Sequence, residues 1–246
     1  YNEKGTEKTM DQKQINILVC DDDKEIAGAI EIYLRNEGYR VFKAYDGIQA
    51  LEIARKETLH LIIMDIMMPK MDGVQATMKL REEQNNPIIM LSAKSEDYDK
   101  ITGLNVGADD YVTKPFNPLE LIARVKSQLR RYVRLGSLSG QNESRSGIYT
   151  TGGLVIDDGQ KSVTLDGEQI PVTPTEYGIL KFLTSNAGKV FSIEQIYEAV
   201  WNEPAYSAEN TVAVHIRRIR EKIEIDPKNP QYLKVVWGIG YKIEKI

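Results

Sequence analysis

Residues 59–69 read LHLIIMDIMMP, an apolar run that ends on a carboxylate. An apolar run of this length, bounded by turn residues, predicts a strand that is buried on both faces of a sheet. Open parallel sheets place their ligands at the carboxyl ends of the strands. Asp65 is therefore a candidate reactive group, although an acidic residue in this position can also simply end a strand.

Three further apolar runs in the first half of the chain also end on polar side chains. Residues 15–20 lead to Asp21 and Asp22, residues 87–91 lead to Ser92, and residues 110–113 lead to Lys114. On one parallel sheet these strand ends would converge. The sequence thus predicts that carboxylates, a hydroxyl group and an ammonium group meet at one edge.

Helical patterns alternate with these strands. Apolar residues recur at helical spacing in residues 26–34, 47–56, 74–83, around residues 101–104 and in residues 118–131, and residues 40–44 form one more strand. Five strand–helix units predict an α/β fold, a flavodoxin-like doubly wound (βα)5 domain with right-handed crossovers.

The predicted cluster of carboxylates suggests a metal ion. Asp21, Asp22 and Asp65 would repel one another unless a cation offset their charge. Mg²⁺ prefers oxygen ligands and keeps several waters while it binds one or two carboxylates together with phosphate oxygens. With Lys114 beside them, these groups suit phosphoryl transfer to Asp65 as the nucleophile. The alternative is an acidic rim that pairs only with Lys114.

The same residues resemble the receiver domain of bacterial two-component response regulators. The motifs are Asp21-Asp22, Asp65-x-x-x-Pro69-x-x-Asp72-Gly73, Ser92-Ala93 and Lys114-Pro115-Phe116. The resemblance implies that Asp65 accepts phosphate from a sensor histidine kinase. It also implies Mg²⁺ ligands at Asp21, Asp22, Asp65 and the Met67 carbonyl, phosphoryl contacts from Ser92 and Lys114, a cis peptide before Pro115, and an aromatic switch at Tyr111.

Phosphatases of the haloacid-dehalogenase type also form an aspartyl phosphate and are the main enzymatic alternative. They need a second Asp two residues after the nucleophile as an acid/base, and this chain has Met67 there. The difference favours a phosphoaspartate that persists, with only Mg²⁺-dependent self-phosphorylation and slow dephosphorylation.

The composition sets limits on location and partners. The 246 residues include one Cys and carry a net charge of −4, and no run approaches the length of a membrane span. We expect a cytoplasmic protein without disulfides. Residues 148–246 hold 11 Lys and Arg against 13 Asp and Glu, so binding to DNA would need a local basic face.

The chain divides into four predicted segments. Residues 1–14 are polar and read as a disordered extension, and residues 15–131 form the receiver. Residues 132–147 are rich in Gly, Ser and Asn and predict a flexible linker. Residues 148–246 form a second domain, in which Asp157-Asp158-Gly159 and Asp166-Gly167 predict turns of an antiparallel sheet of about four strands.

Three helices and a hairpin are predicted to complete the second domain. Thr173-Pro174-Thr175-Glu176 and Ser192-Ile193-Glu194-Gln195 are capping boxes. The third helix begins near Glu209, and its apolar face holds Val212, Ile216, Ile219 and Ile223. Thr211, Val214, Arg217 and Arg218 lie on the opposite face, which is expected to be exposed. This face could enter a DNA major groove, or it could simply be a charged face in contact with water.

Strands at residues 232–237 and 241–243, around Gly238-Ile239-Gly240, complete a pattern that resembles the winged-helix effector domain of the OmpR/PhoB family. The resemblance adds Arg220 and His215 as DNA contacts, although His215 flanks the apolar face of the third helix and could instead be a core residue. Relatives often carry Arg where this chain has Trp237, so Lys234 or Lys242 would supply the phosphate contacts of the wing. The Trp237-Gly-x-Gly-Tyr-Lys-Ile motif is similar to the vancomycin-resistance regulators.

Together the two resemblances imply a DNA-binding response regulator that joins an α/β receiver domain to an α+β winged-helix domain. On phosphorylation it would form a homodimer through Lys100 with Glu120, Asp110 with Arg124, and Asp109 with Arg131. The dimer would bind a tandem repeat in double-stranded promoter DNA and contact RNA polymerase through the loop at residues 201–208. The alternative is a phosphorylation-controlled adaptor whose second domain binds protein.

Overall fold

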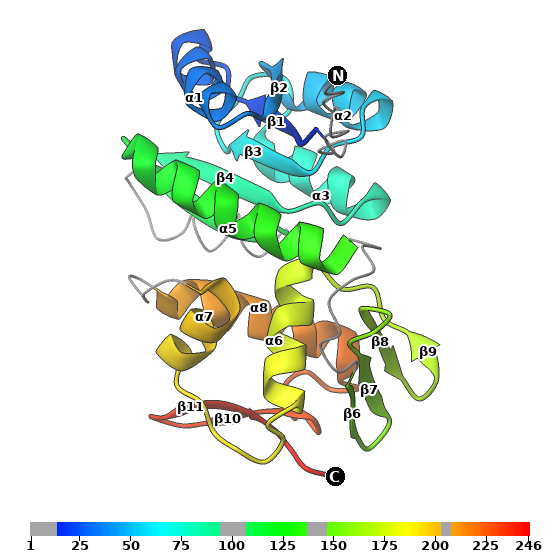
Figure 1. Ribbon diagram of the computed structural model, residues 1–246. Helices are drawn as coiled ribbons and strands as arrows, with labels where there is room; N and C mark the ends of the chain where they lie inside the picture. Colours follow the sequence, from blue (N-terminus) through cyan, green and yellow to red (C-terminus); the bar gives the residue numbers. More distant parts are fainter. Residues whose placement is uncertain (1–13, 94–106, 137–146, 203–207) are drawn as a thin grey trace, which may run out of the picture.

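The structure, a computed structural model, describes residues 14–93, 107–136, 147–202 and 208–246. They form two domains, one above the other in Figure 1. The upper domain holds a parallel sheet of five strands in the order β2-β1-β3-β4-β5. Its strands are β1 (Asn16–Cys20), β2 (Arg40–Ala44), β3 (Leu61–Asp65), β4 (Ile88–Ala93) and β5 (Asp110–Lys114). The predicted flavodoxin-like fold is confirmed.

Helices cover both faces of this sheet. They are α1 (Lys24–Asn36), α2 (Gly47–Lys56), α3 (Gly73–Glu83) and α5 (Pro118–Gly136). One core joins α1 and α5 to one face, and a second core joins α2 and α3 to the other. Strand β3 is buried along its whole length, as its apolar run predicts. The helix expected around residues 101–104 lies outside the described residues.

An aspartate caps the N-terminus of three of these helices. Asp23, Asp46 and Asp72 each accept hydrogen bonds from backbone amides in the first turn of α1, α2 and α3. Such caps satisfy amides that the helix itself cannot bond. Asp23 therefore begins α1 and leaves Asp21 and Asp22 at the end of β1.

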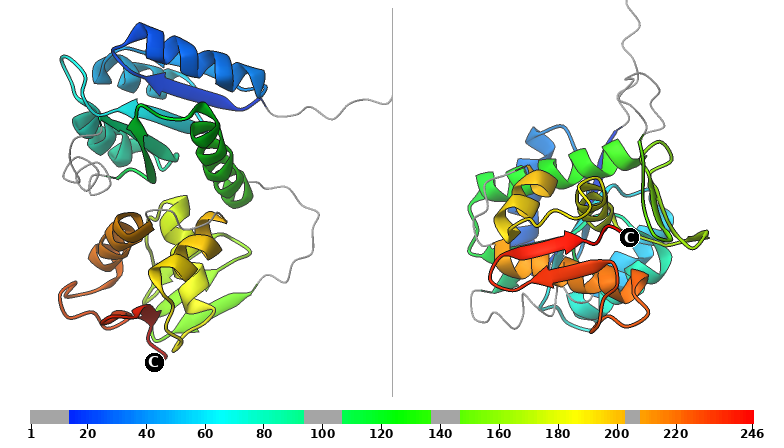
Figure 2. Two further views of the ribbon diagram at one scale, coloured as in Figure 1. Left: turned by 90° about the vertical axis from the view of Figure 1, so that its left-hand side faces the viewer. Right: turned by 90° about the horizontal axis from the view of Figure 1, so that it is seen from below.

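The lower domain combines two antiparallel sheets with three helices. The four-stranded sheet contains β6 (Ile148–Thr151), β7 (Leu154–Asp157), β8 (Ser162–Leu165) and β9 (Glu168–Gln169), and the hairpin contains β10 (Leu233–Val236) and β11 (Gly240–Ile243). The helices are α6 (Pro174–Thr184), α7 (Ile193–Trp201) and α8 (Ala208–Ile223). Both predicted capping boxes are present, at Thr173 and Ser192. The view from below in Figure 2 shows the hairpin lying across the helices.

Helix α5 connects the domains and also packs between them. It runs to Gly136, so the first residues of the predicted linker are helical, and residues 137–146 lie outside the described residues. Helices α6, α7 and α8 lie beneath α5 (Figures 1 and 2). None of the described helices is both long enough and apolar enough to cross a membrane.

Candidate functional site

The strand ends bring three carboxylates together, as the sequence predicts. One ligand atom each from Asp21, Asp22 and Asp65 lies within 4.8 Å of the others. Asp21 and Asp65 are buried, whereas Asp22 is exposed. Oxygen ligands with one open side fit a hard divalent ion that keeps several waters. The three residues could therefore hold Mg²⁺.

Lys114, at the end of β5, supplies the positive charge of the cluster. Its Nζ lies 2.7 Å from Asp21 Oδ2 and 2.9 Å from Asp65 Oδ1. Burial raises the pKa of Asp65 to about 6; Lys114 opposes this shift, and Asp21 and Asp22 add to it. Burial works against the charge of Lys114, but its two carboxylate partners hold its pKa above the usual value. The site thus contains more negative charge than one lysine neutralises.

The loop that follows Asp65 is packed tightly against it. The Gly73 amide donates to the Ile66 carbonyl at 2.9 Å, and a Cβ atom at Gly73 would lie only 1.9 Å from the Asp65 carbonyl oxygen. Lys70 adopts a left-handed φ of 64° and pairs with Asp46 at 2.7 Å. The Asp-Gly pair therefore matters because only glycine allows α3 to start so close to the end of β3.

The other residues predicted for this site come from β4, β5 and the segments that follow β3 and β5. Ser92 is buried, and its Oγ has no hydrogen-bond partner among the described residues. Tyr111 is half-buried against the core on the α2–α3 side of the sheet. The side chain of Met67 is exposed, and the Lys114–Pro115 peptide is cis, as predicted. An unpartnered buried hydroxyl beside Asp65 is suited to a phosphoryl oxygen.

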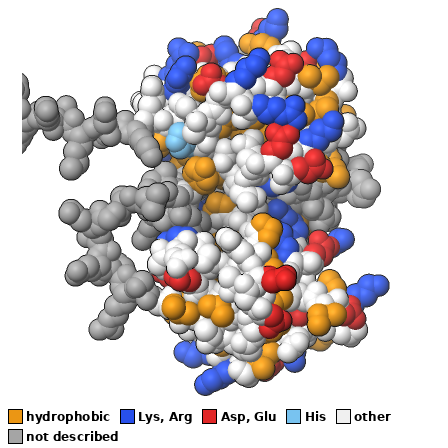
Figure 3. All heavy atoms as spheres, turned by 90° about the vertical axis from the view of Figure 1, so that its right-hand side faces the viewer, with side chains coloured by type: hydrophobic (Ala, Val, Ile, Leu, Met, Phe, Trp, Pro, Cys, Tyr) orange, Lys and Arg blue, Asp and Glu red, His pale blue; other side chains and the backbone are white. Residues whose placement is uncertain are grey.

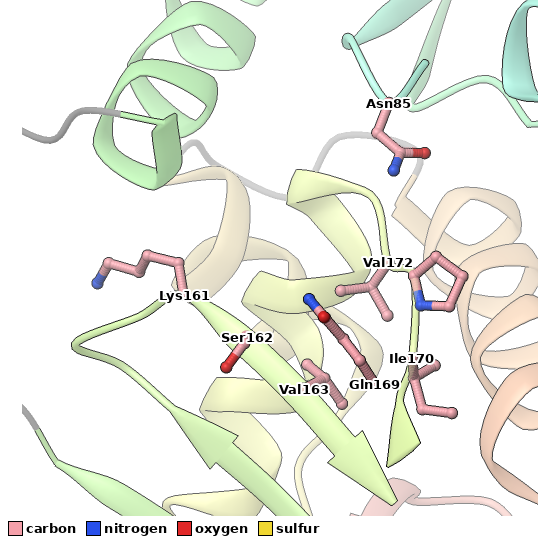
Figure 4. Close-up of a pocket in the computed structure, with 8 residues that line it drawn as sticks. Asn85, Lys161, Ser162, Val163, Gln169, Ile170 and Val172 are labelled. Carbon is pink, nitrogen blue, oxygen red and sulfur yellow. The ribbon is translucent and has the colours of Figure 1, made fainter. Parts of the chain in front are cut away.

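A cavity of about 400 Å³ lies away from this cluster, at the boundary between the domains. Figure 4 shows Asn85 on the upper side, and strand β8, strand β9 and the residues before α6 on the lower side. Its charged lining residue is Lys161, which pairs with Asp158. The cavity is lined by none of the three carboxylates, so it is separate from the cluster at the edge of the sheet.

Helix α8 departs from the prediction. Its apolar residues Val212, Ile216, Ile219 and Ile223 are buried in the core of the lower domain, as expected. Three of the four residues expected to be exposed are buried too, because Thr211, Val214 and Arg218 are each at most 8% exposed. Val214 and Arg218 pack on the upper domain, as does the fully buried His215 beside them. Among the four residues predicted to enter the groove, which all lie in the described part of the chain, only Arg217 is exposed, and it pairs with Glu221. The expectation of an exposed face is wrong in this conformation.

Three direct contacts join α8 to the upper domain. His215 Nε2 lies 3.2 Å from the carbonyl oxygen of Asp109. Arg218 Nη1 donates to the carbonyl oxygen of Ala108 at 3.0 Å. Val214 belongs to the same hydrophobic cluster as Ala108. The segment that leads into β5 therefore binds the helix that the sequence assigns to DNA.

The remaining predicted DNA contacts belong to the wing. Arg220 Nε donates to the Leu233 carbonyl at 2.8 Å, so this side chain holds the hairpin. Lys234 and Lys242 both pair with Glu244. Trp237 at the tip is 87% exposed. On the face shown in Figure 3 basic and acidic side chains are interspersed over both domains, without an extended basic surface.

The predicted dimer residues make contacts within one chain. Arg124 pairs with Asp110 at 3.0 Å and with Glu120 at 3.0 Å. Asp109 pairs with Arg81 at 2.6 Å. Lys100 lies outside the described residues. Two of these residues also contact the lower domain: the Asp109 carbonyl oxygen lies 3.2 Å from His215 Nε2, and Arg131 lies over the Trp201 ring.

Sequence patterns did not point to several other contacts at this boundary, which involve α3, α5 and α7. Ser127 Oγ donates to the Trp201 carbonyl at 2.9 Å, and the Arg131 guanidinium lies 5.4 Å from the centre of the Trp201 ring. Arg81 is partly buried and also donates to the Gly107 and Asn86 carbonyls. Ser127, Arg131 and Arg81 lie on amphipathic helices, where polar residues are usually predicted to be exposed to solvent. The only sequence signal of a contact is Trp201, a large aromatic residue directly before a polar loop.

Comparisons with known proteins agree with this architecture. A family model described as "Response regulator receiver domain" matches residues 17–126, and one described as "Transcriptional regulatory protein, C terminal" matches residues 167–243. The chain is 48% identical to the regulatory protein VanR of Enterococcus faecium over 93% of this chain and 98% of that protein.

Solved structures are similar over almost the whole chain. The response regulator DrrB of Thermotoga maritima, described as an OmpR/PhoB homolog, is 36% identical over 94% of this chain and 99% of its own, with a TM-score of 0.49. A RitR mutant is 26% identical over 94% of this chain and 100% of its own, with a TM-score of 0.72. The chain belongs to the two-component response regulators that join a receiver domain to an OmpR/PhoB-type DNA-binding domain.

Proposed function

We propose that Asp65 is the phosphoacceptor of this transcriptional regulator and that Asp21, Asp22 and the Met67 carbonyl hold Mg²⁺ beside it. The observation that carries the proposal is the convergence of three carboxylates within 4.8 Å, with Lys114 2.9 Å from Asp65. An Asp65 oxygen attacks the phosphorus of a phosphohistidine on a sensor kinase, and the bond from phosphorus to the histidine nitrogen breaks. Lys114 offsets part of the charge that moves, and Mg²⁺ held by Asp21, Asp22 and the Met67 carbonyl would offset more of it.

Labelling with a small acyl phosphate in Mg²⁺ tests this proposal. Asp65→Asn should abolish the label, because an amide cannot accept the phosphoryl group. Asp23→Asn is the matched control: it removes a neighbouring carboxylate, but Asn also caps helices well, so α1 should persist. Undiminished labelling of Asp65→Asn would disprove the assignment.

The proposal extends to the downstream steps. Phosphorylation adds about two negative charges beside Mg²⁺. Ser92 and Tyr111 then move toward the phosphoryl group, and the receiver forms a homodimer through the face that includes Asp110, Glu120 and Arg124. The dimer binds a tandem repeat in promoter DNA and contacts RNA polymerase, all in the cytoplasm.

Salt-dependent DNA binding separates this function from a protein-binding adaptor. The logarithm of the binding constant should fall linearly with the logarithm of the salt concentration. The phosphorylated chain should bind promoter DNA, and Arg217 and Arg218 should both contribute to the affinity. Binding without a salt slope, or with no loss in Arg217→Ala and Arg218→Ala, would favour the adaptor.

A further inference from the structure

We propose that the contact between helix α8 and the receiver is a proton-gated latch, which withholds α8 from DNA only while His215 is neutral. The DNA part of this inference rests on the proposed function. The latch itself follows from the contacts at the domain boundary and can be tested without DNA.

The latch covers the surface of α8 that DNA would need. Val214, His215 and Arg218 pack on the segment before β5, and all three side chains are at most 8% exposed. A helix packed on protein through this face cannot enter a major groove through the same face. Docking on the receiver and docking on DNA are therefore mutually exclusive.

Helix α7 fixes the same arrangement from a second side. Ser127 Oγ on α5 donates to the carbonyl oxygen of Trp201, which ends α7, and Arg131 lies over the Trp201 ring. The Trp201 ring in turn lies 5.7 Å from the His215 ring, centre to centre. His215 is thus enclosed between α7 and the receiver.

The hydrogen bonds of His215 require the neutral ring. Nε2 faces a carbonyl oxygen, which only accepts, so Nε2 carries the proton. Nδ1 is buried and has no hydrogen-bond partner among the described residues. A second proton on Nδ1 would therefore be a buried donor without an acceptor, which is unfavourable.

The surrounding charges also oppose protonation. Six charged side chains face His215 or pair with its neighbours. The cations are Arg81 on α3, Arg131 on α5, and Arg218 and Lys222 on α8. The anions are Asp109, just before β5, and Glu176 on α6. The Asp109 carboxylate is turned away, to Arg81 and the Ile88 amide. Cations thus outnumber anions, and a charged imidazole would add to the excess.

Burial, with Arg218 next in size, lowers the pKa of His215 to about 4, while Asp109 and Glu176 act in the opposite direction. In an open form an exposed histidine has a pKa of about 6.5. Closing therefore releases a proton, so the closed form is fully favoured above pH 6.5 and loses stability as the pH falls toward 4. From pH 7.5 to pH 5.5 the equilibrium constant for closing should fall about tenfold.

Histidine NMR tests the latch directly, because the chain has two histidines, His60 and His215. The full unphosphorylated chain is titrated in Mg²⁺. The His215 signal should titrate well below pH 6, whereas in Ser127→Arg it should move toward pH 6.5, because a large side chain at Ser127 would collide with Trp201. The His60 signal is the internal reference and should not change.

Matched variants keep this test specific. Ala123→Arg places the same charge on an exposed position of the same helix and should leave His215 unchanged. Arg131→Glu removes the cation over Trp201 and provides a second opening variant if Ser127→Arg does not fold. The latch is overturned if His215 titrates near pH 6.5 in the unmodified chain, or if neither opening variant shifts it.

Binding to a generic duplex of about 30 base pairs at low salt measures the consequence. Ser127→Arg should bind more tightly than Ala123→Arg at pH 7.5, and the gap should narrow at pH 5.5. Both variants retain Asp65 and the other ionisable groups of the receiver, so the comparison removes their contribution. If both variants bind the duplex and their affinities are equal at both pH values, the latch is overturned. If His215 shifts as expected but no variant binds the duplex, the latch stands and the DNA-binding function fails.

Discussion

Arg218 donates a 3.0 Å hydrogen bond to the carbonyl oxygen of Ala108, a residue that lies 110 positions earlier in the chain. The donor belongs to the helix that the sequence assigns to DNA, and the acceptor lies just before β5, whose last residue is Lys114. One short strand therefore separates the phosphoacceptor site from the contact that holds α8. A displacement of β5 on phosphorylation would reach both.

The pKa of Asp65 predicts a pH-dependent affinity for Mg²⁺. Burial raises this pKa to about 6, so in the metal-free protein a proton competes with the cation below pH 6. The affinity should fall about tenfold for each pH unit below 6. Calorimetric titrations at pH 7.5, 6 and 5 measure it. Asp65→Asn should bind Mg²⁺ more weakly, and its affinity should not depend on pH in this range. An affinity of the unmodified chain that stays constant with pH would contradict the raised pKa of Asp65.

Lys114 should stabilise the receiver most when Mg²⁺ is absent. Lys114→Gln leaves Asp21 and Asp65 without their ammonium partner, which should cost on the order of 3 kcal/mol of unfolding free energy in a chelator. Added Mg²⁺ should restore much of this loss. Denaturant melts measure both values.

Lys70→Gln is the control for this experiment. Lys70 pairs with Asp46 through a side chain that is 62% exposed, so its loss should cost less than about 1 kcal/mol. Mg²⁺ should not rescue it selectively. Equal losses in the two variants would show that Lys114 is an ordinary surface lysine.

Gly73→Ala should damage the phosphoacceptor site through the backbone. The added Cβ would lie 1.9 Å from the Asp65 carbonyl oxygen, so either α3 or Asp65 must shift. We expect a loss of about 1–3 kcal/mol in stability and slower labelling by an acyl phosphate. Gly28→Ala on α1, where nothing lies within 4 Å of the new Cβ, should instead stabilise by about 0.5–1 kcal/mol. Normal labelling in Gly73→Ala would refute the argument.

Arg217 and Arg220 should separate DNA contact from structural support. Arg217 is exposed, so Arg217→Ala should reduce the salt slope of DNA binding by about one and leave the melting curve unchanged. Arg220 holds the hairpin through Leu233, so Arg220→Ala should lower stability by about 1–2 kcal/mol. An Arg220→Ala protein that melts normally but loses salt slope would instead make Arg220 a direct contact.

Local patterns were sufficient for most of the receiver and for its site. The apolar run before Asp65, the capping aspartates and the two capping boxes are each short stretches whose physical consequences do not depend on distant residues. Parallel strands that run side by side end at one edge of the sheet, so the sequence predicts that Asp21, Asp22, Asp65 and Lys114 lie close together. Their observed distances agree with that inference.

The orientation of helix α8 could not be obtained in the same way. Its pattern separates an apolar face from a mixed face, and the apolar face is buried as expected. A mixed face that carries Thr211, Val214 and Arg218 is compatible with water, with DNA or with another domain, because its polar atoms can be satisfied by any of them. The Ala108 and Asp109 carbonyls, which satisfy Arg218 and His215 here, are backbone groups without a sequence signature. Amphipathic periodicity thus defines which side of a helix faces its own core, while the partner of the opposite side is set by long-range packing.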